Sequence, residues 1–152
     1  VAEDVAAREG ETEASSGHGL SAQFIETITR ALEHGDLATA KSLALPLHYS
    51  DLGDLIETLD IEQRSKLIDQ IRDDFDPVVL TELDETVREQ VIEQLGMKEV
   101  AEAVAEMDSD DAIFVVGELE QHEQDALLAS LPAEDRTVIR EGLAYERAPR
   151  AA

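Results

Sequence analysis

From Leu55 onward, the apolar residues of this chain recur with a period of twelve. Each period has two adjacent apolar residues, then two other residues, then a single apolar residue. The sets are Leu55-Ile56 with Leu59, Leu67-Ile68 with Ile71, Val79-Leu80 with Leu83, Val91-Ile92 with Leu95, Ala103-Val104 with Met107, Val115-Val116 with Leu119, and Leu127-Leu128 with Leu131. Ile139 and Leu143 close the series, and Arg140 interrupts it where an apolar residue is expected. Leu43, Ala44 and Leu47 fit the pattern one period before Leu55. Within a unit this spacing indicates one face of a short helix.

One continuous helix cannot bury this pattern. An α-helix turns by about 100° per residue, so twelve residues overshoot three turns by about 120°, and the apolar stripe would circle the helix within three units. The chain must therefore end one helix and begin the next in every unit. The residues that follow the last apolar position suit such breaks, because Asp caps helix starts, Gly ends helices and Pro favours the first turn. They are Asp60, Arg72, Asp84, Gly96, Asp108, Glu120 and Pro132.

Arg72 is the one poor helix breaker in this set, so we expect residues 72–77 to form a longer connection that ends in a helix start at Asp76-Pro77. Alternate units resemble each other more than adjacent ones: LDIEQR (Leu59 to Arg64) is similar to LDETVR (Leu83 to Arg88) and LPAEDR (Leu131 to Arg136). Helices of about ten residues need neighbours for stability. The pattern therefore predicts an all-α solenoid of about ten short helices, stacked as helical hairpins of 24 residues.

Composition narrows the possible partners. The chain has 152 residues, 36 acids against 12 bases, and a formal net charge of −24. This excess of acids argues against nucleic acid and anionic membrane surfaces and favours cations, basic partners or simple solubility. An aromatic content of 3% predicts an aliphatic core, and the absence of cysteine excludes disulfides and thiolate metal sites. No apolar run approaches the roughly 20 residues of a membrane-spanning helix.

Enzyme motifs are nearly absent from the sequence, and we expect no enzymatic activity. There is no P-loop, GxGxxG, GxSxG or HExxH pattern. The four histidines, His18, His34, His48 and His122, have no second histidine at ligand spacing. We interpret each as a solvated or helix-capping residue.

The stretch MDSDD, Met107 to Asp111, is the strongest candidate for chemistry. It suits a helix start, in which Asp108 or Ser109 is the cap and the other acids face the helix dipole. An EF-hand loop is excluded by Ile113 and Leu119 at the turn and final-ligand positions. Between Glu99 and Asp135, however, twelve acids occur without a Lys or Arg. Such a surface is either a solvated acidic face or half of a weak divalent-cation site that a second acidic surface completes.

Several stretches resemble the cytosolic N-terminal domain of MgtE-type magnesium transporters over roughly residues 22 to 146. Ala31, Leu32, Gly35 and Asp36 match the family's ALxxGD helix end, and His48, Asp51, Leu52 and Leu59 match its HPxDLAxLLExL stretch, with Tyr49 in place of Pro. The L(D/P)xExR step appears at Leu59 to Arg64 and at Leu131 to Arg136, and the LxxDDA step as Met107, Asp110, Asp111 and Ala112. GLAYERAP, Gly142 to Pro149, looks like the family's passage into the next domain but departs from it after Tyr145.

The resemblance implies a right-handed α-superhelix on the cytoplasmic side of the membrane, in a protein that also has paired CBS domains and a dimeric membrane channel. Mg²⁺ held weakly between this domain and the CBS domains of the same polypeptide would stabilise the closed state. The family's ligand step falls on Asp110, with Asp111 beside it. The sequence departs from the family at Phe114 and Val78, where the family can place acids, and Glu106, Asp108 or Glu118 could substitute.

For the domain boundaries, we expect a disordered arm over residues 1–19, the helical domain over 20–145, and a linker over 146–152 toward a following domain. The isolated domain is expected not to insert into membranes. The alternative reading is a helical-repeat interaction module similar to the flagellar motor switch protein FliG, which would bind a partner helix and need no ion.

Overall fold

The computed structural model describes residues 20–147, and every regular element in this part of the chain is a helix. It contains nine α-helices and two 3₁₀ helices. They are α2 (Ala22–Glu33), α3 (Leu37–Ala44), α4 (Tyr49–Thr58), α5 (Ile61–Ile71), η1 (Arg72–Asp74), η2 (Pro77–Glu82), α6 (Glu85–Leu95), α7 (Met97–Ala105), α8 (Ser109–Gly117), α9 (Gln121–Ser130) and α10 (Ala133–Arg147). The prediction of an all-α fold made of short helices is confirmed.

The helices begin at the predicted twelve-residue interval. The starting residues are Leu37, Tyr49, Ile61, Glu85, Met97, Ser109, Gln121 and Ala133, and only the start expected near residue 73 is not an α-helix. Asp60 caps α5, and its side chain accepts a hydrogen bond from the Gln63 backbone N–H at 2.8 Å. Asp84 caps α6 in the same way through Val87 at 2.9 Å. Gly96 ends α6 with a φ of 91°, a conformation that favours glycine.

The connection after Arg72 is longer than the others, as predicted, but the helix that follows is not an α-helix. Asp76 and Pro77 do start a helix, and the Asp76 side chain accepts a hydrogen bond from the Val78 N–H at 3.0 Å. The element is the six-residue 3₁₀ helix η2, which ends at Glu82 just before the Asp84 cap of α6. Two short 3₁₀ helices, η1 and η2, therefore occupy the unit in which one α-helix was expected.

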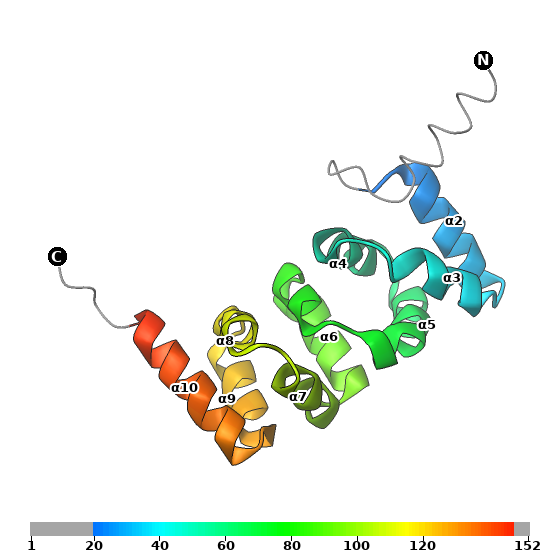
Figure 1. Cartoon of the computed structure of the whole chain (residues 1–152). Helices are drawn as coiled ribbons and strands as arrows, with labels where there is room; N and C mark the ends of the chain where they lie inside the picture. Colours follow the sequence, from blue (N-terminus) through cyan, green and yellow to red (C-terminus); the bar gives the residue numbers. More distant parts are fainter. Residues whose placement is uncertain (1–19, 148–152) are drawn as a thin grey trace.

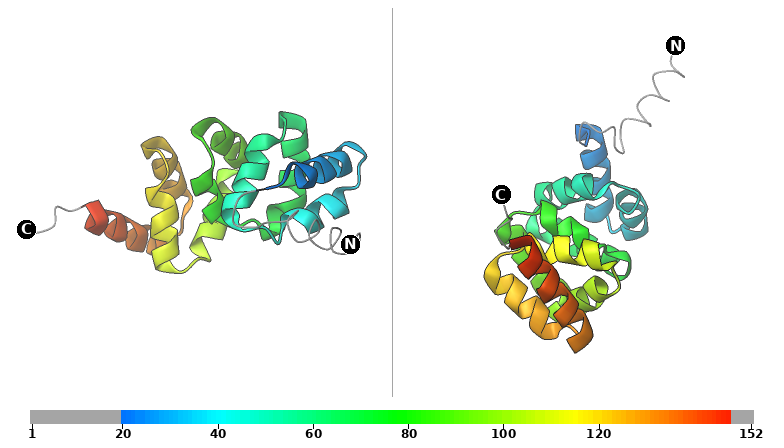
Figure 2. Two further views of the ribbon diagram at one scale, coloured as in Figure 1. Left: turned by 90° about the horizontal axis from the view of Figure 1, so that it is seen from above. Right: turned by 60° about the vertical axis from the view of Figure 1, so that its left-hand side comes forward.

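The elements follow one another along a curved, elongated body, with α2 and α10 at opposite ends (Figures 1 and 2). One series of contacts runs from α4 to η2, from η2 to α8 and from α8 to α10. Another runs from α3 to α5, α6, α7 and α9. Several of these pairs begin 24 residues apart, for example α3 with α5 and α8 with α10. Alternate helices, which begin 24 residues apart, are therefore in contact in these pairs. The right-handed sense of the superhelix stays a prediction.

The core is aliphatic, as the composition predicts. Phe24 is the only buried aromatic residue between residues 20 and 147. The residues of the twelve-residue pattern are buried with few exceptions, and Leu43, Ala103 and Met107 are half-buried. Each short helix thus buries one face against its neighbours, which supplies the stability that its length alone cannot.

The proposed arm over residues 1–19 and most of the proposed linker lie outside the described residues. Helix α10 continues to Arg147, two residues beyond the expected end of the domain. None of the helices between residues 20 and 147 has the length and apolar character that crossing a membrane requires.

Candidate functional site

Asp110 and Asp111 both lie in the first turn of α8, and both side chains are exposed. Asp108 is the N-cap residue, but its side chain makes no capping hydrogen bond. Within residues 20–147, the carboxylates of Asp110 and Asp111 have no hydrogen bond or ion pair. Helix capping therefore does not account for these carboxylates, and they remain available to a ligand outside the described residues.

The start of α8 lies beside the start of α10. A small hollow is lined by Met107 and Ser109 on one side and by Asp135 and Val138 on the other. Ser109 lies near Asp135 at the start of both helices, and Gly117 lies near Leu143 farther along them, so the first turns of α8 and α10 lie at the same end of the pair. Both first turns are acidic, with Asp110 and Asp111 in α8 and Glu134 and Asp135 in α10. The positive ends of two helix dipoles partly compensate this concentration of negative charge.

Most of the acidic stretch is exposed. The exposed acids are Glu102, Glu106, Asp108, Asp110, Asp111, Glu118, Glu120, Asp125 and Glu134. Two other acids of the stretch are paired with arginines from outside it: Glu99 with Arg72 at 3.0 Å and Glu123 with Arg88 at 2.7 Å. These two arginines therefore neutralise only part of this surface, and the start of α8 stays negative.

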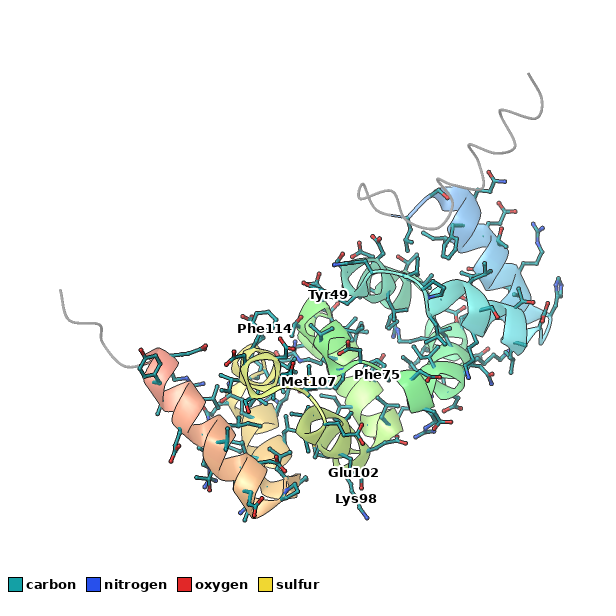
Figure 3. All side chains as sticks on the ribbon, viewed as in Figure 1. Tyr49, Phe75, Lys98, Glu102, Met107 and Phe114 are labelled. Carbon is teal, nitrogen blue, oxygen red and sulfur yellow. The ribbon has the colours of Figure 1, made fainter. Side chains whose placement is uncertain are left out.

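The two departures from the family pattern lie on elements that pack together, because η2 contacts α8. Val78 is half-buried in η2, and Phe114 is 47% exposed one turn after Asp110 (Figure 3). Apolar side chains thus stand where the family can place acids. The three possible substitutes, Glu106, Asp108 and Glu118, are exposed.

The chemistry of these side chains fits Mg²⁺, but the described residues do not complete its shell. Mg²⁺ binds oxygen ligands in an octahedron, keeps several waters and accepts one or two carboxylates. Asp110 and Asp111 supply such oxygens. They do not belong to any group of three acids or histidines whose ligand atoms lie within 4.8 Å of one another among residues 20–147. The site can hold a hydrated dication only loosely unless another surface adds ligands.

The structure brings together a second cluster that the sequence did not predict. Glu85 and Glu89 on α6 and His122 on α9 place one ligand atom each within 4.8 Å of one another. Nε2 of His122 lies 2.9 Å from Oε1 of Glu89. This hydrogen bond, with the nearby carboxylates, raises the pKa of His122 above its ordinary value. The only signal in the sequence is the i, i+4 spacing of the two glutamates, which gives no reason to pair them with His122.

The other histidines fit their predicted roles where the structure describes them. His48 caps α4, and its Nδ1 accepts a hydrogen bond from the Ser50 N–H at 3.1 Å. His34 is the exposed residue after α2. His18 lies outside the described residues.

A buried ion pair fixes the position of α6 against α9. Arg88 donates from Nε to Oε2 of Glu123 at 2.8 Å and from Nη2 to Oε1 at 2.7 Å. Both side chains are less than 10% exposed. Burial alone would raise the pKa of Glu123, but hydrogen bonds from Arg88 and the Glu120 N–H lower it below its ordinary value. The partner carboxylate likewise raises the pKa of Arg88, so both groups stay charged.

Comparisons with known proteins test the fold and the family of the chain. No curated protein matches the chain. A solved structure, titled "Crystal structure of the soluble part of a magnesium transporter", superposes with a TM-score of 0.59 at 22% sequence identity. The match covers 81% of this chain and 49% of that one, so this chain spans about half its length. That likeness supports the fold. The model of the family "MgtE intracellular N domain" matches residues 47–148, two thirds of the chain, and the protein therefore belongs to this family.

Proposed function

We propose that this chain is a cytoplasmic Mg²⁺-sensing regulatory domain of a magnesium transporter, in which Asp110 and Asp111 supply half of a shared ion site. The observation that carries the proposal is the pair of exposed carboxylates at the start of α8, unpaired within residues 20–147, in a stretch that has no Lys or Arg from Glu99 to Asp135. Membership of the MgtE family supports the role in a magnesium transporter. Asp110 and Asp111 have no third ligand nearby among the described residues, so a second surface is needed to complete the ion site.

The facing surface in this proposal is the pair of CBS domains of the same polypeptide, in a full-length protein that is a homodimer. Two acidic surfaces repel each other when bare, and dications between them convert repulsion into attraction. The packed, closed arrangement is then favoured only when cytosolic Mg²⁺ is high. Decisive switching between two states requires a differential binding energy of about 5 kcal/mol, so several weak ions acting together are expected.

The test compares Mg²⁺ binding by the 152-residue chain with binding by a longer polypeptide that includes the CBS domains, at constant ionic strength. Calorimetric titration should show at least tenfold tighter binding by the longer polypeptide. Asp110→Ala with Asp111→Ala should remove this gain. Asp54→Ala with Glu62→Ala removes the same charge from exposed positions of α4 and α5 and should leave the gain intact.

Equal affinity in the two polypeptides would argue against a shared site. A gain that survives the Asp110 and Asp111 double substitution would instead show that sharing is real but that other acids provide the ligands.

One observation favours the alternative of an ion-independent interaction module. Phe114 and Tyr49 are 47% and 38% exposed, and both lie on the upper side of the body in Figure 3. Exposed aromatic side chains suit protein contacts. Under this alternative, Phe114→Ala would weaken the association of this chain with its partner helix. Mg²⁺ would have no effect on that association.

A further inference from the structure

We propose that Glu85, Glu89 and His122 form a second metal site, selective for a first-row transition-metal dication such as Zn²⁺ and separate from the Asp110 and Asp111 surface. The cluster joins two helices that are far apart in the sequence, α6 and α9. It combines an imidazole nitrogen with two carboxylate oxygens, so it differs in kind from the oxygen-only acids of α8. The proposal stands independently of the function proposed above.

The ligand types determine the class of ion. Imidazole nitrogen is a preferred ligand of Zn²⁺, Ni²⁺, Cu²⁺ and Fe²⁺, whereas Mg²⁺ prefers an all-oxygen shell and dehydrates reluctantly. One histidine and two carboxylates give three ligands, and water can fill the fourth position of a tetrahedral Zn²⁺. The site should therefore take Zn²⁺ in the presence of a large excess of Mg²⁺.

The distances are compatible with binding after small side-chain rotations. Zn²⁺ binds His nitrogen and carboxylate oxygen at about 2.0–2.2 Å, so ligand atoms of one tetrahedral ion are roughly 3.3 Å apart. Nε2 of His122 and Oε1 of Glu89 are already 2.9 Å apart, and the three ligand atoms all lie within 4.8 Å of one another. All three residues are exposed, so the side chains can rotate inward without disturbing the core.

The backbone that carries the ligands is held in place. Arg88 and Glu123, the immediate neighbours of Glu89 and His122, form the buried bidentate pair between α6 and α9. Beside the cluster, Ile92, Met97 and Ala126 line a hollow together with Glu89 and His122. The ligands therefore start close to their bound arrangement, and only side-chain freedom is lost on binding.

The experiment titrates ZnCl₂ into the 152-residue chain in a non-chelating buffer with excess MgCl₂, by calorimetry. One tight site per chain is expected. His122→Ala should weaken Zn²⁺ binding at least tenfold, and so should Glu85→Gln, which changes charge but little shape. His34→Ala removes an exposed histidine elsewhere and should leave the affinity unchanged. In NMR spectra, the ring signals of His122 should shift as Zn²⁺ is added, up to one equivalent. The ring signals of the other histidines should not shift in this way.

Unchanged affinity in the His122→Ala variant, or an equal loss in His34→Ala, would overturn the proposal. Circular dichroism establishes that each variant is folded, and if His122→Ala does not fold, Glu85→Gln decides the question alone. Asp110→Ala with Asp111→Ala should leave the Zn²⁺ affinity intact. Failure of this site and failure of the Mg²⁺ site are therefore distinguishable.

Discussion

At the residue scale, the repeated arginine of the LxxExR-like steps serves to end the preceding helix. Arg64 donates from Nε to the Ile56 carbonyl at 2.8 Å and from Nη2 to the Leu59 carbonyl at 2.9 Å. Arg136 makes the same two hydrogen bonds, to the carbonyls of Leu128 at 2.8 Å and Leu131 at 2.9 Å. Carbonyl groups at a helix end lack partners within the helix. The guanidinium satisfies two of them at once and fixes the angle between consecutive helices.

Arg136→Ala should therefore lower the free energy of unfolding by about 1–3 kcal/mol, because two carbonyl groups lose charged donors. Arg136→Lys should recover only part of this loss, since an ammonium group cannot reproduce the fork of the guanidinium. Urea denaturation of the three chains measures the effect. Arg140→Ala, at an exposed position of the same helix, is the control and should stay within about 0.5 kcal/mol of the unchanged chain. A loss of stability in Arg140→Ala as large as that in Arg136→Ala would contradict this role.

At the scale of the element, the sequence predicted helix starts well because their causes are local. Asp60 and Asp84 accept hydrogen bonds from residues three positions ahead, so their roles can be read from a short window. The Asp76-Pro77 start was also visible, but the 3₁₀ form of η2 was not, since it depends on how α4 packs against it. The contact of His122 with Glu89 was missed for a similar reason, because α6 and α9 meet only through tertiary stacking.

For the candidate Mg²⁺ residues too, the nearby sequence predicts some properties, whereas others depend on how distant helices pack. The exposure of Asp110 and Asp111 follows from their place in the first turn of α8, and this was predictable. The number of ligands was not, because the acids of neighbouring helices converge or diverge according to packing. The described residues leave the pair without a third ligand, and the surface proposed to complete it is not among them.

The close approach of α4 and η2 depends on Gly53. This residue is buried in α4, and a Cβ atom placed there would lie 2.7 Å from the Cβ atom of Glu82. Gly53→Ala should push the two elements apart and lower the free energy of unfolding by about 1–3 kcal/mol, although alanine is the better helix former. In Gly117→Ala, the nearest atom is Leu143 Cδ2 at 3.4 Å, and stability should not fall. Thermal unfolding of both variants checks this, and equal midpoints would show that the elements separate without cost.

At the scale of the whole molecule, charge opposes the compact fold. The net charge is −24, and most acids of the Glu99 to Asp135 stretch have no basic partner within the described residues. The buried Arg88–Glu123 pair and the aliphatic core hold this repulsive surface together. A surface that remains repulsive without dications is what a cation-dependent switch requires, because neutralising it internally would remove the difference between the two states.

Simple salt should therefore stabilise the chain. Raising NaCl from about 10 mM to about 150 mM shortens the Debye length from about 30 Å to about 8 Å and screens repulsion between exposed carboxylates. The thermal unfolding midpoint, followed by circular dichroism, should rise over this range and then level off. KCl should give the same curve, because screening depends on ionic strength and not on the identity of the monovalent cation. A flat or falling midpoint in NaCl would show that the exposed acids do not repel enough to destabilise the fold. That result would also argue against the proposed Mg²⁺ switch, because the proposal needs repulsion between two acidic surfaces in the absence of dications.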